Sequence, residues 1–167
     1  MKSLSFIFVT VCAVLVIFSG VISVSCSKDA CKTVTCLNKG TCSGGACSCP
    51  TGWTGNSCQT SVFIGNWNGR DVCDSSGNFA MSVGVDASTQ TTGKYIITNP
   101  HGYAGQVSGN LSADGKTITI ATQPIGPVFL SGSLFLNTNT SFGFSYTTSD
   151  TGKLAKSENC SGTYQKQ

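Results

Sequence analysis

Residues 31–58 read CKTVTCLNKGTCSGGACSCPTGWTGNSC, and this stretch organises the rest of the chain. Six of its 28 residues are cysteines, with almost no aliphatic side chain between them. Such a segment cannot bury enough apolar surface to fold alone, so covalent cross-links must hold it together. Successive cysteines are separated by four, five, four, one and eight residues. Spacing alone leaves fifteen ways of pairing them.

The cysteine spacing, together with the sequence Cys-Pro-Thr-Gly-Trp-Thr-Gly at residues 49–55, resembles an EGF-like module. The resemblance covers the whole of residues 31–58. It implies three disulfide bonds, which join Cys31–Cys42, Cys36–Cys47 and Cys49–Cys58. The calcium-binding subtype of this module carries acidic residues just before its first cysteine, whereas here Asp29 stands alone. We therefore expect a structural module without bound calcium.

Clustered cysteines can instead be zinc ligands. Here a single Cys-x-Cys pair occurs, at Cys47 and Cys49, and the sole histidine, His101, lies far along the chain. No second pair of ligands has the spacing of a zinc finger. We accordingly expect no metal site and no cofactor.

The N-terminal residues 1–25 have the pattern of a secretory signal peptide. Lys2 is followed by an apolar run from Leu4 to Val24 that contains no charge. The run is long enough to span a membrane, but its position, basic start and small residues at its end favour a cleaved signal. We therefore expect export to a compartment in which disulfides persist.

The junction Val24-Ser25-Cys26 is similar to a bacterial lipoprotein cleavage site, in which a small residue precedes a cysteine that becomes lipidated. Ser23 stands where such sites usually carry leucine. Once the signal and its Cys12 are removed, Cys26 is the one cysteine without an expected partner. The alternative is ordinary cleavage, with Cys26 free or paired between molecules. Lipidation of Cys26 with fatty acyl groups such as palmitate would make the membrane a partner and residues 26–30 a short tether.

Residues 62–167 read as a separate all-β domain. Gly, Ser, Thr and Asn dominate, and apolar residues alternate with polar ones, as in half-buried strands. The alternating positions are Phe79, Met81, Val83 and Val85; Tyr103, Val107 and Leu111; Ile118 and Ile120; Leu130, Leu134 and Leu136; and Phe142, Phe144 and Tyr146. Seven turn sequences separate the runs, of which Asp114-Gly115 is the clearest tight hairpin. The pattern predicts about eight short antiparallel strands.

Eight up-and-down strands leave two exposed edges unless the first strand pairs with the last. Cys73 lies in the first run and Cys160 in the last. A Cys73–Cys160 disulfide would close that seam. We therefore predict an antiparallel β-barrel after the EGF-like module, with a two-sheet β-sandwich as the alternative.

The opening strand contains Gly65-Asn66-Trp67, and its Gly-x-Trp sequence is similar to the first strand of lipocalin-like barrels. The arginine with which that family covers the tryptophan from the closing strand is missing. Arg70 is the only arginine and it lies on the opening strand itself. A small or filled interior is as compatible with this short domain as a ligand pocket.

No catalytic pattern is found in the sequence. His101 lies in a Pro-Gly turn, where we interpret it as a solvated turn residue, and the acidic residues are scattered. No serine lies in a Gly-x-Ser-x-Gly elbow. The net charge of +3 comes from lysines spread along the chain, so no nucleic-acid partner is expected. We expect a protein that is not an enzyme.

The order of signal, cysteine, cysteine-rich module and small β-domain resembles Gram-negative outer-membrane lipoproteins. That resemblance implies a membrane-anchored protein of the outer membrane or cell surface, or of the periplasm, with a non-enzymatic binding or structural role. One alternative is a secreted, extracellular protein of eukaryotic type whose EGF-like module binds other proteins. A further alternative is a lipocalin-like carrier of a small apolar ligand.

Overall fold

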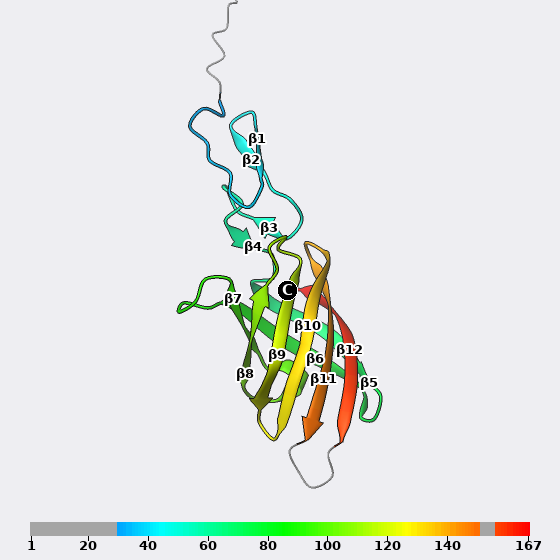
Figure 1. The fold of residues 1–167 in the computed structure, drawn as a ribbon. Coiled ribbons are helices and arrows are strands. Elements are labelled where there is room, and N and C mark those ends of the chain that lie inside the picture. The colour runs from blue at the N-terminus through cyan, green and yellow to red at the C-terminus, as the bar shows by residue number, and fades with distance from the viewer. Residues whose placement is uncertain (1–29, 151–155) are drawn as a thin grey trace, which may run out of the picture.

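The computed structural model describes residues 30–150 and 156–167. A small cysteine-rich part lies against one end of a β-barrel, as Figure 1 shows. The expected signal peptide, residues 1–25, and the expected lipidation site, Cys26, lie outside the described residues. Among the described residues, no helix combines the length and the apolar character needed to cross a bilayer.

The cysteine-rich part contains two small antiparallel sheets. β1 (Thr41–Ser43) pairs with β2 (Ala46–Ser48), and β3 (Trp53–Thr54) pairs with β4 (Thr60–Ser61). Its three disulfides have the first–third, second–fourth and fifth–sixth order that the EGF-like resemblance implies, namely Cys31–Cys42, Cys36–Cys47 and Cys49–Cys58. Most of its side chains are exposed or half-buried, so cross-links replace a hydrophobic core.

Eight strands form the closed barrel, each paired with its neighbours in the chain and the last with the first. They are β5 (Gly65–Cys73), β6 (Gly77–Ala87), β7 (Lys94–Thr98), β8 (Gln106–Leu111), β9 (Thr117–Ile125), β10 (Val128–Thr138), β11 (Ser141–Asp150) and β12 (Ser157–Lys166). The short 3₁₀ turn η1 (Pro100–Gly102) lies between β7 and β8. The predicted antiparallel barrel is confirmed, and the sandwich alternative is wrong because the sheet closes on itself. Tyr103 falls in the loop after η1 rather than in a strand.

The seam joins β12 to β5. Cys160 lies directly opposite Cys73, and Lys166 lies opposite Trp67 at the other end of the pair. The expected Cys73–Cys160 disulfide is present, with its Cα atoms 4.1 Å apart. Closure therefore leaves neither terminal strand with an open edge.

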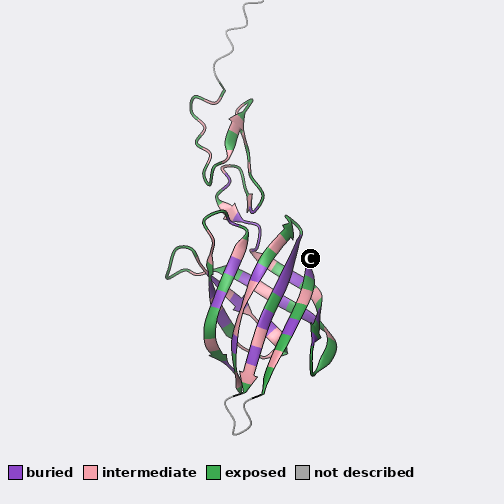
Figure 2. Ribbon diagram, turned by 45° about the vertical axis from the view of Figure 1, so that its right-hand side comes forward, coloured by how far each residue is buried: buried purple, intermediate pink, exposed green. Residues whose placement is uncertain are grey.

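Side chains fill the interior of the barrel. Figure 2 shows buried and exposed residues alternating along the strands, as their sequence alternation requires. Trp67, Phe142 and Tyr164 are fully buried. The centroid of the Phe142 ring lies 4.7 Å from the centroid of the Trp67 ring and 5.1 Å from that of the Tyr164 ring. Of the two possibilities left open by the sequence, the filled interior is the one observed.

Two contacts seat the cysteine-rich part on the barrel. The Trp53 indole packs on Gly115 of the β8–β9 hairpin so closely that a Cβ on this glycine would collide with it. The backbone N–H of Gly52 donates to Asn139 Oδ1, in the β10–β11 hairpin, over 3.2 Å. β4 precedes β5 by three residues, and both residues of β4 are paired with β3, so a small sheet lies at this junction. The opposite end of the barrel, where β5 ends and β12 begins, faces away from the module (Figure 1).

Candidate functional site

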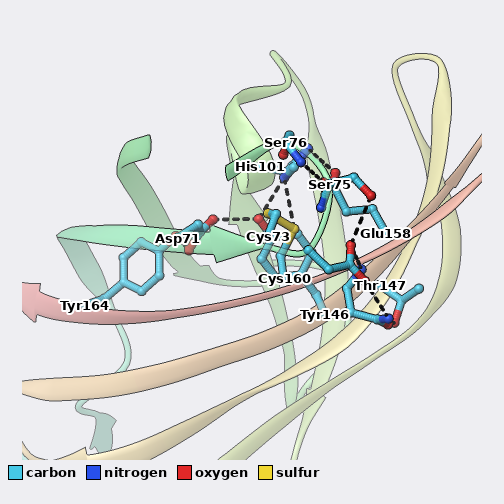
Figure 3. The surroundings of a disulfide bond; sticks show 12 residues. Asp71, Cys73, Ser75, Ser76, His101, Tyr146, Thr147, Glu158, Cys160 and Tyr164 are labelled. Carbon is cyan, nitrogen blue, oxygen red and sulfur yellow. Dashed lines mark hydrogen bonds and ion pairs between the residues drawn. A yellow bond between two sulfur atoms is a disulfide. The ribbon is translucent and has the colours of Figure 1, made fainter. Parts of the chain in front are cut away.

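A chain of polar side chains enters the barrel at the end remote from the cysteine-rich part. Its innermost member is Asp71, which is fully buried. The phenols of Tyr146 and Tyr164 each donate a hydrogen bond of 2.6 Å to this carboxylate, one to each oxygen (Figure 3). A buried carboxylate is costly unless hydrogen bonds satisfy it, and these two phenols meet that need.

Strand register creates the space for Asp71. The residue points inward from β5, on the same face as Trp67 and Cys73. Its partner across the seam is Gly162 of β12, and a Cβ at that position would collide with Asp71 Oδ1. The glycine therefore leaves room for a carboxylate in an otherwise apolar layer.

Burial and the adjacent carboxylate act on both tyrosines. Burial raises the pKa of Tyr146 far above the usual value for a phenol, and the hydrogen bond to Asp71 raises it further. The pKa of Tyr164 is raised for the same two reasons, in the same order. Both phenols consequently remain protonated donors throughout the neutral range.

His101 continues the chain from Tyr146 towards solvent. Its Nδ1 lies 2.8 Å from the Tyr146 hydroxyl oxygen. The Tyr146 hydroxyl donates its hydrogen bond to Asp71, so its oxygen can only accept from the imidazole. His101 Nδ1 therefore carries the hydrogen and donates a hydrogen bond to the phenol oxygen. The imidazole is also surrounded by the rings of Phe79, Tyr103 and Tyr146, with centroids 5.3 to 5.5 Å away.

The interpretation of His101 as a solvated turn residue is therefore wrong. Its side chain is only 10% exposed. His101 has a left-handed backbone, with φ of 55°, and η1 carries its ring inward beneath the barrel end. The sequence indicates the turn around the histidine, but it does not indicate the direction in which the loop folds.

Glu158 lies at the outer end of the chain. Its Oε1 accepts backbone N–H groups from Ser75, over 3.1 Å, and from Ser76, and its Oε2 lies 4.0 Å from His101 Nε2. Burial by itself would raise the pKa of Glu158, but the hydrogen bonds from Ser76 and Ser75 outweigh it and lower the pKa below the usual value. Glu158 thus places a negative charge beside the outer face of the imidazole.

The seam disulfide forms the wall of this site. Cys160 Sγ is 3.8 Å from His101 Nδ1, and Cys73 Sγ belongs to the same cluster, whose three ligand atoms lie within 4.8 Å of one another. In this structure both sulfurs are bonded to each other.

A pocket of about 450 Å³ opens at the same barrel end, which we call the mouth pocket. Most of the residues that line it have polar or charged side chains; the lining comprises Ser75, Ser76, His101, Tyr103, Val128, Thr148, Asp150, Lys156, Ser157 and Glu158. Hydroxyl, ammonium, imidazole and carboxylate groups together can hydrogen-bond a small polar molecule. They do not form the apolar lumen that a carrier of apolar ligands needs.

Of the residues that the sequence indicated for disulfides or lipidation, Cys73 and Cys160 lie at this site. The cysteines of the EGF-like resemblance lie beyond the other end of the barrel. Asp71 was missed by sequence reasoning, although its alternation with Trp67 and Cys73 marks it as an inward-facing carboxylate.

Lys166 was missed in the same way. Its Nζ lies 5.2 Å from the Trp67 ring, in a cation–π contact, and donates to the Val62 carbonyl oxygen. A lysine from the closing strand therefore covers the tryptophan, where lipocalin-like barrels use an arginine. Arg70 is exposed on the outer face of β5.

No known family matches this chain, and no curated protein is similar to it in sequence. Among solved structures, a redesigned β-barrel called b11L5F_LGL is similar, with 18% identity and a TM-score of 0.49 over 64% of this chain and 92% of that one. Two others are EF1p2_mFAP2b bound to DFHBI, and the redesigned barrel mFAP1, also bound to DFHBI. Both are 16% identical, with TM-scores of 0.49 and 0.48; they cover 64% and 63% of this chain and 94% and 95% of their own. Likenesses this weak carry no argument about a ligand.

Proposed function

We propose that this chain is a membrane-anchored lipoprotein without enzymatic activity, which presents the mouth pocket of its barrel for binding at the cell surface or in the periplasm. One observation carries the proposal. The cysteine-rich part, with which the described residues begin, and the mouth pocket lie at opposite ends of the molecule. An anchor at Cys26 would therefore hold the pocket away from the membrane, with the EGF-like module as a spacer.

The anchoring chemistry rests on the residues around Cys26. Two or more acyl chains hold a protein stably on a bilayer, because each buried methylene contributes about 0.8 kcal/mol. Residues 26–30 would be a short tether between the anchor and the module, and three disulfides cross-link the adjoining residues 31–58.

Binding at the mouth pocket is favoured over transport inside the barrel. Aromatic side chains occupy the interior, whereas the pocket is open and most of its lining residues carry polar groups. We therefore place a small polar ligand at the mouth in preference to an apolar ligand in the lumen.

A non-enzymatic role fits the state of the reactive groups. His101 Nδ1 donates its hydrogen bond to Tyr146, and both nearby sulfurs are in a disulfide. A thiol nucleophile would require a free sulfur, and in this structure Cys73 and Cys160 are bonded to each other.

The test is metabolic labelling with a radioactive fatty acid, with fractionation of membranes. We expect label on the wild type and on Cys12→Ser, whose cysteine leaves with the signal peptide. Cys26→Ser should lose both the label and the membrane association. Label retained by Cys26→Ser, or a mature N-terminus at another residue, would contradict the proposal.

A further inference from the structure

The seam disulfide and the sole histidine of the chain lie together at the mouth of the barrel. Cys73 Sγ, Cys160 Sγ and His101 Nδ1 are within 4.8 Å of one another (Figure 3), so one metal ion could reach all three atoms once the sulfur–sulfur bond is opened. In the disulfide form the two sulfurs are not ligands, because a metal binds thiolates and not a disulfide, and His101 Nδ1 is engaged with Tyr146.

The scaffold would keep these three atoms together after that bond opens. Cys73 and Cys160 are direct partners in the β5–β12 ladder, whose backbone hydrogen bonds do not depend on the disulfide. The His101 ring is held between aromatic side chains and lies at the wall of the mouth pocket, which gives an ion a route from solvent. A site on rigid strands needs little rearrangement to form.

Glu158 places a carboxylate near the other nitrogen of the imidazole. A metal-bound imidazole usually gives its other N–H to a carboxylate, which fixes the tautomer and strengthens the ligand. Glu158 Oε2 lies 4.0 Å from Nε2, and the N–H groups of Ser75 and Ser76 hold the carboxylate in that position.

We propose that reduction of the Cys73–Cys160 disulfide converts the barrel mouth into a zinc site with Cys73, Cys160 and His101 as ligands. The reductant is a dithiol, which transfers two electrons and two protons to the sulfurs and itself becomes a disulfide. Zn²⁺ then displaces the two thiol protons and forms two sulfur–zinc bonds. Zinc replaces the proton on His101 Nδ1, which passes to solvent, and Nε2 takes up a proton from solvent, so the neutral imidazole then has its hydrogen on the side of Glu158.

Such a site would respond to the redox state of its surroundings. The disulfide form has two neutral sulfurs and an imidazole engaged with Tyr146. The dithiol form has three of the ligands that tetrahedral zinc requires, and its fourth position would be open towards the pocket, as in zinc sites that keep a water.

The sole histidine allows a direct test by ¹⁵N NMR of the imidazole in the full, ¹⁵N-labelled chain. The protein is fully reduced with a phosphine and titrated with ZnCl₂ to saturation. We expect the Nδ1 resonance to move from the position of a protonated nitrogen to that of a metal-bound one, while the Nε2 resonance moves to the position of a protonated nitrogen. The oxidised protein should show no such change.

Matched variants separate this site from the other reduced cysteines. Cys73→Ser with Cys160→Ser keeps the six cysteines of residues 31–58, and there we expect zinc to leave the imidazole resonances unchanged. Glu158→Gln should still bind at Nδ1 but about 10- to 100-fold more weakly. An unchanged Nδ1 resonance in the reduced wild type, whether folded or not, overturns the proposal. The same shift in the double variant also overturns it.

Discussion

Unfolding in alkali should be driven by the two buried phenols beside Asp71. Tyr146 and Tyr164 are 3% and 0% exposed, and the pKa of each is raised far above that of a free phenol. The native state therefore keeps both protons at pH values where the unfolded chain loses them. The stabilisation by each phenol is complete below the unfolded pKa of about 10 and declines as the pH rises above it.

The size of this effect follows from proton linkage. Each proton retained only by the native state lowers the free energy of unfolding by about 1.36 kcal/mol per pH unit. Two phenols give a slope of about −2.7 kcal/mol per unit well above pH 10. Between pH 10 and 11.5, where the unfolded tyrosines are titrating, the loss is about 3 kcal/mol.

The assay is urea unfolding at a series of pH values, followed by circular dichroism. Tyr146→Phe and Tyr164→Phe should each be less stable at pH 7, because Asp71 keeps only one phenol donor. The decisive quantity is the slope of stability against pH, which each variant should reduce by half. If either variant keeps the wild-type slope, the corresponding phenol is not held protonated in the barrel and the reasoning fails.

Two further predictions concern the seam and the junction. The double variant Cys73→Ala with Cys160→Ala should lower the free energy of unfolding in urea by about 4–5 kcal/mol. This is the chain-entropy value for the loop that the disulfide closes, whose ends are 87 residues apart. An unchanged urea midpoint would contradict the prediction. Gly115→Ala and Gly77→Ala both place a side chain at positive φ, +74° and +84°, which costs about 1–2 kcal/mol. Only the Cβ at residue 115 meets Trp53, so Gly115→Ala should be the more destabilising and should alter tryptophan emission. Equal stability losses with identical emission spectra would show that Trp53 does not depend on this contact.

Local patterns in the sequence were sufficient for the fold class. The cysteine spacing of residues 31–58 resembles that of an EGF-like module, and the disulfide order that this resemblance implies is the one in the structure. Alternation and turn residues predicted the eight strands, because each strand must turn every second side chain towards the core. The two cysteines at the ends of residues 62–167 predicted the seam, because a disulfide requires its Cα atoms to lie close together.

The candidate site depended instead on which residues the closed sheet places opposite one another. Asp71, Tyr146 and His101 are far apart in the chain and match no motif, so their hydrogen bonds could not be read from spacing. Closure sets Asp71 opposite Gly162, and a single register shift would turn that carboxylate to the outside. The inward fold of η1 places His101 beside a sulfur of the disulfide instead of in water. The sequence could not predict this, because a loop residue has no periodicity that indicates where its side chain points.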